Sequence, residues 1–146
     1  MKILIIGYGA VGSVLTKLLV KENSIDSIFC LDIRFFERIK NKKIIFKLFN
    51  VLEKEKFVSY LNEIKPDVVI NTSLPKFNTS IMQCCARAKV NYMDAASYWD
   101  LDPNPNAKVP YKMEQLDFEK SFAKNNITGL IEAGVAPGLD NLLAAE

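Results

Sequence analysis

The stretch KILIIGYGAVG, residues 2–12, decides the fold, because an apolar run leads directly into glycines spaced G-x-G-x-x-G. Gly7 permits a tight turn out of a strand, and Gly9, which has no Cβ, lets a pyrophosphate approach the backbone. Gly12 lets the next helix pack closely on that strand. The N-terminus of the helix then offers unpaired N–H groups and the positive end of its dipole. The stretch is therefore typical of a strand–turn–helix unit that binds the phosphates of a dinucleotide.

An acidic residue, Asp32, ends a second apolar run and follows Gly12 by 20 positions. A carboxylate at that point can accept hydrogen bonds from both ribose hydroxyls of an adenosine. It also repels a 2′-phosphate, which favours NAD over NADP. Arg34 acts in the opposite direction, because a guanidinium can pair with a phosphate or stack on adenine. We expect NAD as the cofactor, with NADP as the alternative.

Strand-like apolar runs and segments of helical period alternate along the whole chain. We predict strands at residues 2–6, 27–31, 43–49, 67–71, 90–93 and 127–131. We predict helices at residues 11–20, 53–64, 78–88 and 112–125, a short helix or loop at 33–40, a proline-rich loop at 100–110 and a last helix from Pro137. The fold class is therefore α/β: a doubly wound, mostly parallel six-stranded Rossmann sheet in the order 3-2-1-4-5-6, with helices on both faces.

A ligand of such a sheet lies across the carboxyl ends of strands 1 and 4, where the strand order reverses. Beside the glycines, the cofactor candidates at the strand ends are Asp32, Ile33, Arg34, Asn50, Val51, Asn71, Thr72 and Ser73. Asn50 could equally cap the helix that follows it, and turn chemistry explains residues 71–73 almost as well. The candidates for the substrate side are Asp94, after strand 5, and Pro137 and Gly138, after strand 6. Asp94 could instead cap the next turn, and Pro137 with Gly138 could simply start a helix.

Composition excludes several classes of protein and site. The net charge of +2 is too small to indicate nucleic acid as a partner. No apolar run is long enough to span a bilayer, and the N-terminus does not resemble a signal peptide, so we expect no membrane association and a cytoplasmic location. The chain has no histidine, which argues against a zinc site or a His-based triad, and we expect no metal. Its three cysteines are expected to be free thiols.

Four stretches give the chain a family resemblance: GYGAVG at 7–12, DVVINTSLP at 67–75, YMDAASY at 92–98 and GVAPGLDNLLA at 134–144. With them the chain resembles the saccharopine dehydrogenase family, including its carboxynorspermidine and homospermidine relatives. The last stretch is the most distinctive, because Rossmann domains in general lack a Gly-x-x-Pro-Gly segment after the sixth strand. The resemblance covers essentially the whole chain.

The resemblance implies a pyridine-nucleotide oxidoreductase that joins or splits an amine and a carbonyl acid through an imine, with amino-acid or polyamine-type substrates. It implies that Asp32 and Arg34 hold the adenosine, while residues 71–73 border the nicotinamide. It also implies that Asp94 and Ser97 lie on the substrate side. The pyrophosphate would be held by Gly7, Tyr8, Gly9, Ala10, Val11 and Gly12.

Members of that family are several hundred residues long, and most of their substrate domain follows the point at which this chain ends. We therefore expect residues 1–146 to be an NAD(P)-binding domain from the N-terminal part of a longer enzyme. A Rossmann domain alone leaves the nicotinamide open to water, so we expect cofactor binding with little or no turnover. No catalytic residue is assigned within the chain. A homodimer could form through an exposed sheet edge or helix face.

Two other classes of protein share parts of this pattern. Nucleotide-sensing regulatory domains of potassium-transport systems also combine a glycine-rich first loop with an acid after strand 2, at about this length. The GVAPGLD segment and the proline-rich loop favour the oxidoreductase. Short-chain epimerases and dehydratases need a Tyr-x-x-x-Lys pair, and no tyrosine of this chain is followed by lysine at that spacing.

Overall fold

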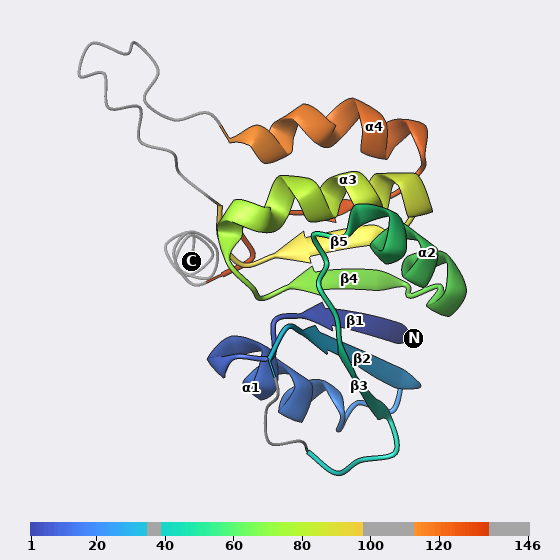
Figure 1. Cartoon of the computed structure of the whole chain (residues 1–146), viewed down its shortest axis with the longest axis vertical. Coiled ribbons are helices and arrows are strands. Elements are labelled where there is room, and N and C mark those ends of the chain that lie inside the picture. The colour runs from blue at the N-terminus through green and yellow to red at the C-terminus, as the bar shows by residue number, and fades with distance from the viewer. Residues whose placement is uncertain (35–38, 98–112, 135–146) are drawn as a thin grey trace, which may run out of the picture.

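The sheet is six-stranded and wholly parallel, in the order β3-β2-β1-β4-β5-β6 (Figure 1). It is seen in a computed structural model that describes residues 1–34, 39–97 and 113–134. The strands are β1 (Lys2–Ile6), β2 (Ser27–Asp32), β3 (Ile44–Leu48), β4 (Val68–Asn71), β5 (Asn91–Asp94) and β6 (Gly129–Leu130). The predicted fold class and strand order are confirmed.

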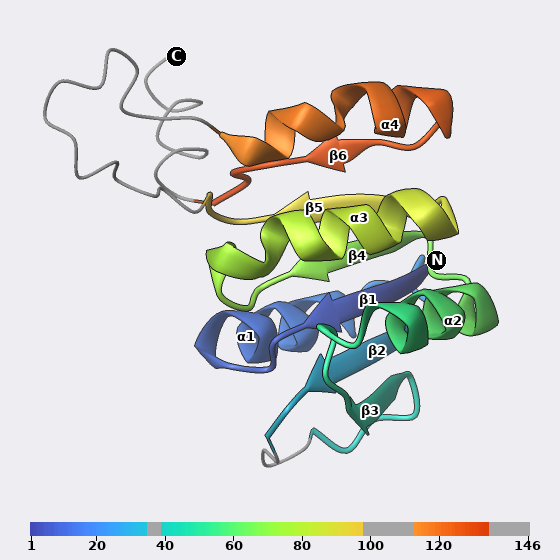
Figure 2. The same ribbon diagram turned by 45° about the horizontal axis from the view of Figure 1, so that its top comes forward.

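Helices cover both faces of the sheet, but unequally. They are α1 (Ala10–Leu19), α2 (Lys54–Ile64), α3 (Asn78–Ala88) and α4 (Glu119–Lys124), with short 3₁₀ helices η1 (Pro75–Phe77) and η2 (Glu114–Phe118). Among the described residues, α1 lies on one face, and α2, α3 and α4 pack on the other (Figure 2). No helix in these ranges is long and apolar enough to cross a membrane.

The core consists of two layers, one on each side of the sheet. Alternate residues of β1 belong to opposite layers: Leu4 packs with α2 and α3, while Ile3 and Ile5 pack on the α1 side. Continuous apolar strands are typical of a parallel sheet, because both of its faces are buried. The continuous apolar sequence of the strands therefore already indicates that helices lie on both sides of the sheet.

Left-handed residues terminate two of the helices. Lys65 after α2 and Lys89 after α3 have φ values of 48° and 56°. Each donates its backbone N–H to a carbonyl of the last turn, so that α2 and α3 end in the αL cap that glycine usually makes. A side chain at such a position costs conformational energy.

The structure differs from the predicted elements mainly near the C-terminal end of the described region. In place of the continuous helix predicted at 112–125, the described residues form η2 and then α4, with Gln115 of η2 buried and Leu116 exposed. The strand predicted at 127–131 pairs only at Gly129–Leu130, between left-handed residues at Asn126 and Glu132. Residues 35–38 of the segment predicted at 33–40, the loop predicted at 100–110 and the helix predicted from Pro137 lie outside the described residues.

Candidate functional site

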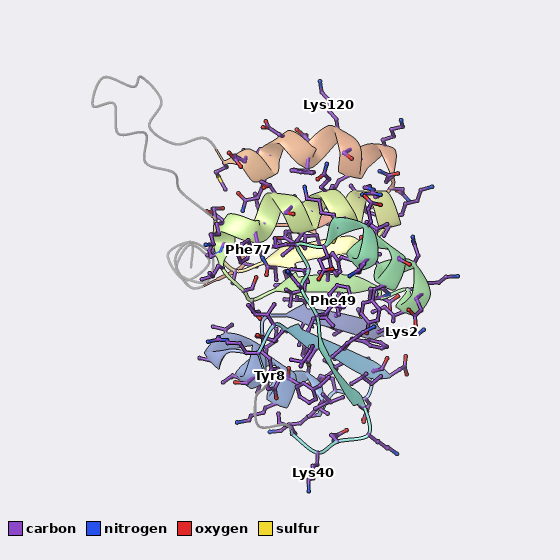
Figure 3. The ribbon with its side chains drawn as sticks, in the orientation of Figure 1. Lys2, Tyr8, Lys40, Phe49, Phe77 and Lys120 are labelled. Carbon is purple, nitrogen blue, oxygen red and sulfur yellow. The ribbon has the colours of Figure 1, made fainter. Side chains whose placement is uncertain are left out.

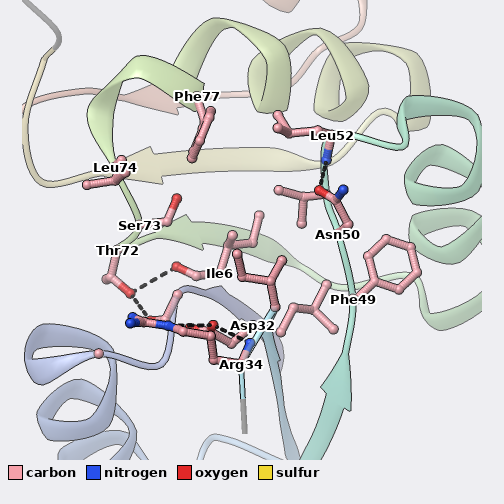
Figure 4. Close-up of a pocket in the computed structure, with 15 residues that line it drawn as sticks. Ile6, Asp32, Arg34, Phe49, Asn50, Leu52, Thr72, Ser73, Leu74 and Phe77 are labelled. Carbon is pink, nitrogen blue, oxygen red and sulfur yellow. Dashed lines mark hydrogen bonds and ion pairs between the residues drawn. The ribbon is translucent and has the colours of Figure 1, made fainter.

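A cavity of about 510 Å³ opens at the carboxyl ends of β1, β2 and β4, where the strand order reverses (Figure 4). Loops from four strands contribute to it, and most of its side chains are apolar. Its lining residues are Ile6, Gly7, Gly9, Leu31, Asp32, Ile33, Arg34, Phe49, Asn50, Val51, Leu52, Thr72, Ser73, Leu74 and Phe77.

The glycine loop is shaped by two close contacts and one open space. Gly7 has a φ of +88°, and a Cβ there would lie 2.8 Å from the backbone of Ser73. A Cβ on Gly12 would overlap the carbonyl oxygen of Gly7 and lie 2.7 Å from Oγ1 of Thr72. Gly9, in contrast, has nothing within 4 Å of its Cβ position. It lies at the start of α1, where no side chain caps the helix and no acid occupies the first turn. The N–H groups there are available to an anion.

Thr72 ties this loop to β4. Its hydroxyl donates to the carbonyl oxygens of Gly7 and Ile6, at 2.7 Å and 3.0 Å, and its backbone N–H donates to Ile6 at 2.8 Å. From the other side, the N–H of Gly7 donates to the carbonyl of Leu31 at 2.8 Å. The turn is therefore fixed by both neighbouring strands before any ligand binds.

The Asp32 carboxylate is built into the same loop. Oδ2 accepts the backbone N–H of Tyr8 at 2.8 Å, and Oδ1 accepts that of Arg34 at 2.9 Å. A carboxylate oxygen has two acceptor sites, so each still has one available for a ribose hydroxyl. The Arg34 side chain is 72% exposed, and its Nε lies 4.0 Å from Oδ1. The acid and the cation stand side by side at the wall of the cavity (Figure 4).

Two of the predicted site residues are occupied by turn chemistry. Asn50 accepts the N–H of Leu52 at 3.1 Å through its side chain, although it also lines the cavity. Asn71 is buried; its Oδ1 accepts both the N–H and the hydroxyl of Ser73, and its amide donates to Asn78 at 2.7 Å. Asn71 thus supports the loop from below and does not line the cavity.

The structure places Tyr8 differently from the other residues of the glycine loop. Its ring is buried on the α1 side, edge-on to Phe46 with centroids 4.7 Å apart, whereas Phe49 and Phe77 pack against the core on the other side of the sheet (labelled in Figure 3). Tyr8 thus contributes to the glycine loop through its backbone, whose N–H donates to Asp32, and not through its ring. The predicted residues brought together at the cavity are Gly7, Gly9, Asp32, Ile33, Arg34, Asn50, Val51, Thr72 and Ser73. Those that do not line it are Tyr8, Ala10, Val11, Gly12 and Asn71.

Sequence reasoning missed the apolar wall of the cavity. Leu52, Leu74 and Phe77 follow strands β3 and β4, and an apolar lining of this kind suits an aromatic base. Their signal was present in the sequence, since Leu52 and Leu74 are large apolar residues in turns where polar residues are usual. Both remain about half exposed.

A second polar cluster lies at the ends of β5 and β6. Asp94 is 1% exposed; Oδ2 accepts the hydroxyl of Tyr92 at 2.9 Å and the amide of Gln115 at 3.3 Å, and Oδ1 accepts the N–H of Glu132 at 2.9 Å. Burial and the nearby carboxylate raise the pKa of Tyr92, which keeps the phenol protonated as a donor. Ser97 joins the cluster through Gln115, at 2.9 Å.

The hydrogen bonds of Asp94 link β5 to η2, through Gln115, and to the residues after β6, through Glu132. Asp94 therefore has a structural role whatever ligand lies near it, and its partners Gln115 and Glu132 were not recognised from the sequence. The other predicted substrate-side residues, Pro137 and Gly138, lie outside the described residues.

Residues 3–130 match the family described as "Saccharopine dehydrogenase NADP binding domain". The chain belongs to the saccharopine dehydrogenase family. These residues form the NAD(P)-binding domain of that family of oxidoreductases, so the resemblance inferred from the sequence is confirmed.

Relatives of this saccharopine dehydrogenase domain support the assignment along almost its whole length. It is 32% identical to carboxynorspermidine synthase from Vibrio cholerae, over 99% of this chain and 39% of that protein. It is 26% identical to carboxyaminopropylagmatine dehydrogenase from Synechocystis, over 99% and 37%. Saccharopine dehydrogenase (L-Glu forming) from Saccharomyces cerevisiae has the same fold, with a TM-score of 0.72 at 18% identity, over 98% of this chain and 29% of that one. The chain spans about two fifths of the curated relatives that it matches.

Proposed function

We propose that this domain binds NAD(H) for an oxidoreductase that forms or breaks a carbon–nitrogen bond between an amine and a carbonyl acid. The observation that carries the proposal is the cavity at the reversal of strand order, with the glycine loop on one wall and Asp32 on another. The bound nicotinamide would supply the hydride donor or acceptor of that reaction.

The lining of the cavity supports a proposed path for the dinucleotide. The pyrophosphate would lie over Gly9, where there is open space and the uncapped start of α1. The adenosine ribose would bind Asp32, and the adenine would lie against Ile33 and Leu52. Ser73, Leu74 and Phe77 would border the path to the nicotinamide.

We favour NAD over NADP on charge. The Asp32 side chain is 12% exposed and lies at the wall of the cavity, where it would repel a 2′-phosphate. Arg34 could bind that phosphate, but its guanidinium already stands beside the carboxylate. The balance between this acid and this cation sets the ratio of the two affinities.

The substrate class is proposed from the relatives. Carboxynorspermidine synthase and carboxyaminopropylagmatine dehydrogenase are both named for carboxylated amines, which supports an amino-acid or polyamine-type substrate here. Because the chain spans about two fifths of these relatives, we propose that it binds cofactor with little or no turnover by itself. Three free, buried cysteines fit a reducing cytoplasm.

Fluorescence titration of the chain with NADH and with NADPH tests the proposal. We expect saturable NADH binding that Gly9→Asp weakens at least about tenfold, because like charges brought together cost several kcal/mol. Position 9 has room for a side chain, so this variant should fold. Ser24→Asp, which adds the same charge on an exposed loop, is the matched control. If neither nucleotide binds, or if both variants bind like the parent, the proposed site is wrong.

A further inference from the structure

Two buried asparagines lie behind the part of the cavity wall that carries Ser73. Asn71 ends β4 and Asn78 begins α3; each is 2% exposed, and neither lines the cavity. A buried amide needs partners for both its oxygen and its nitrogen. Here the partners form a chain of hydrogen bonds that starts at the Ser73 hydroxyl and runs into the protein. The direction of that chain determines what Ser73 can offer to a ligand.

Backbone groups fix the direction of the chain at both ends. At the cavity end, the N–H of Ser73 can only donate, and it lies 3.0 Å from Oδ1 of Asn71. At the other end, the carbonyl oxygen of Ala96 can only accept, and it receives the Asn78 amide at 2.8 Å. The Asn71 amide therefore donates to Oδ1 of Asn78, at 2.7 Å. Turning either side chain over would place two donors or two acceptors face to face.

The Ser73 hydroxyl has consequently given its proton to the protein. Its Oγ lies 2.6 Å from Oδ1 of Asn71, which is an acceptor, so the hydroxyl must be the donor of this hydrogen bond. A serine hydroxyl has one proton and two acceptor lone pairs. The neighbouring hydroxyl of Thr72 is in the same state, because it donates to the carbonyl oxygens of Gly7 and Ile6. Both hydroxyls therefore face a ligand only as acceptors.

This polarity separates two regions of the cavity. The start of α1 at Gly9 offers backbone N–H donors, which suit a phosphate. Phosphate oxygens are themselves acceptors, so a phosphate beside Ser73 would face an acceptor without a proton between them. A ligand group that binds Ser73 must instead bring its own donor, either a hydroxyl or an amide N–H.

We propose that Ser73 is a specificity-determining residue, which accepts a hydrogen bond from a hydroxyl or amide N–H on the nicotinamide half of the cofactor. The inference rests on the proposed cofactor site. Ser73 lies with Leu74 and Phe77 on the side of the cavity opposite Asn50 (Figure 4), along the path proposed for the nicotinamide. That half of NAD(H) carries two kinds of donor, the ribose hydroxyls and the carboxamide.

Ser73→Ala tests the proposal, because it removes the acceptor and keeps the backbone N–H that Asn71 binds. Calorimetric titration compares four ligands: NADH, its 3-acetylpyridine analogue, ADP-ribose and ADP. The variant should bind NADH about three- to tenfold more weakly than the parent does, which is the effect of one hydrogen bond. It should bind ADP, which lacks the nicotinamide half, within about twofold of the parent. Ser59→Ala removes an exposed hydroxyl from α2 and is the matched control, with no change for any ligand.

The other two ligands identify the donor. Weaker binding of NADH, the analogue and ADP-ribose would assign it to the ribose hydroxyls, which all three contain. Weaker binding of NADH alone would assign it to the carboxamide, because the analogue keeps the carbonyl but lacks the amide N–H, and ADP-ribose lacks the whole group. Either result supports the proposal.

Three results would overturn it. A loss for NADH and the analogue but not for ADP-ribose would show that Ser73 donates to the carbonyl. Equal losses for all four ligands would show a structural effect on the whole cavity, and no loss for NADH would show that Ser73 makes no such hydrogen bond. In each case the parent chain still binds NADH. A parent that binds neither NADH nor NADPH would instead overturn the proposed cofactor site, and this inference with it.

Discussion

The backbone N–H of Tyr8 donates a hydrogen bond of 2.8 Å to Oδ2 of Asp32, which joins the acid after β2 to the glycine loop after β1. Oδ1 of the same carboxylate accepts the N–H of Arg34. The acid therefore serves the apo structure as well as the proposed ribose site. Its substitution should change stability and nucleotide choice together.

Asp32→Asn should raise the affinity for NADPH relative to NADH by about tenfold, because it removes a negative charge from the proposed position of the 2′-phosphate. It should also cost about 1–2 kcal/mol of unfolding free energy, since a charge-assisted pair of hydrogen bonds is weakened. Competitive titration and urea denaturation measure the two effects. Arg34→Ala is the counterpart and should lower the NADPH:NADH ratio. If neither variant changes the ratio of NADPH to NADH affinity, the 2′-phosphate does not bind beside Asp32 and Arg34.

The glycines of the loop should differ sharply in tolerance. Gly12→Ala should cost about 3 kcal/mol of unfolding free energy or more, because its Cβ would overlap the backbone of Gly7 and crowd Thr72. Gly9→Ala should stay within about 0.5 kcal/mol of the parent, because the space around its Cβ is open and its φ of −81° suits any residue. Urea denaturation compares them. Equal losses for both variants would contradict the packing role of Gly12.

Strand identity and order were predictable because each strand carries its own signal. The run of residues 2–6 is apolar throughout, and Asp32 and Pro66 mark strand and helix ends locally. Contacts between distant residues carry no such signal. Nothing near Gln115 shows that it is buried against Asp94, and helical spacing there suggested a continuous helix in place of the split at residue 118. The apolar wall at Leu74 and Phe77 likewise becomes visible only when the strand ends meet.

Lys89→Gly should stabilise the domain by about 0.5–1 kcal/mol, because Lys89 ends α3 with a φ of 56°, a conformation in which a Cβ is strained. Thermal and urea denaturation should both report the gain. Lys89→Ala is the matched control: it removes the same charge but keeps the Cβ, so it should give no gain. Stabilisation by alanine equal to that by glycine would show that charge, and not backbone strain, is responsible.

Cys30 should make the stability of the domain depend on alkaline pH. Burial raises the pKa of its thiol from 9.0 to about 11, although the hydroxyl of Thr16 acts in the opposite direction. Below pH 9 the thiol is protonated in both states, and its contribution is fully present. As the pH rises from 9 toward 11, the unfolded chain releases this proton first, so the free energy of unfolding should fall by about 2–3 kcal/mol.

Cys30→Ala should remove that part of the dependence of the unfolding free energy on pH, whatever its effect on stability at neutral pH. Urea denaturation between pH 8 and pH 11 measures both proteins, and parallel pH profiles would show that Cys30 does not titrate as its burial requires.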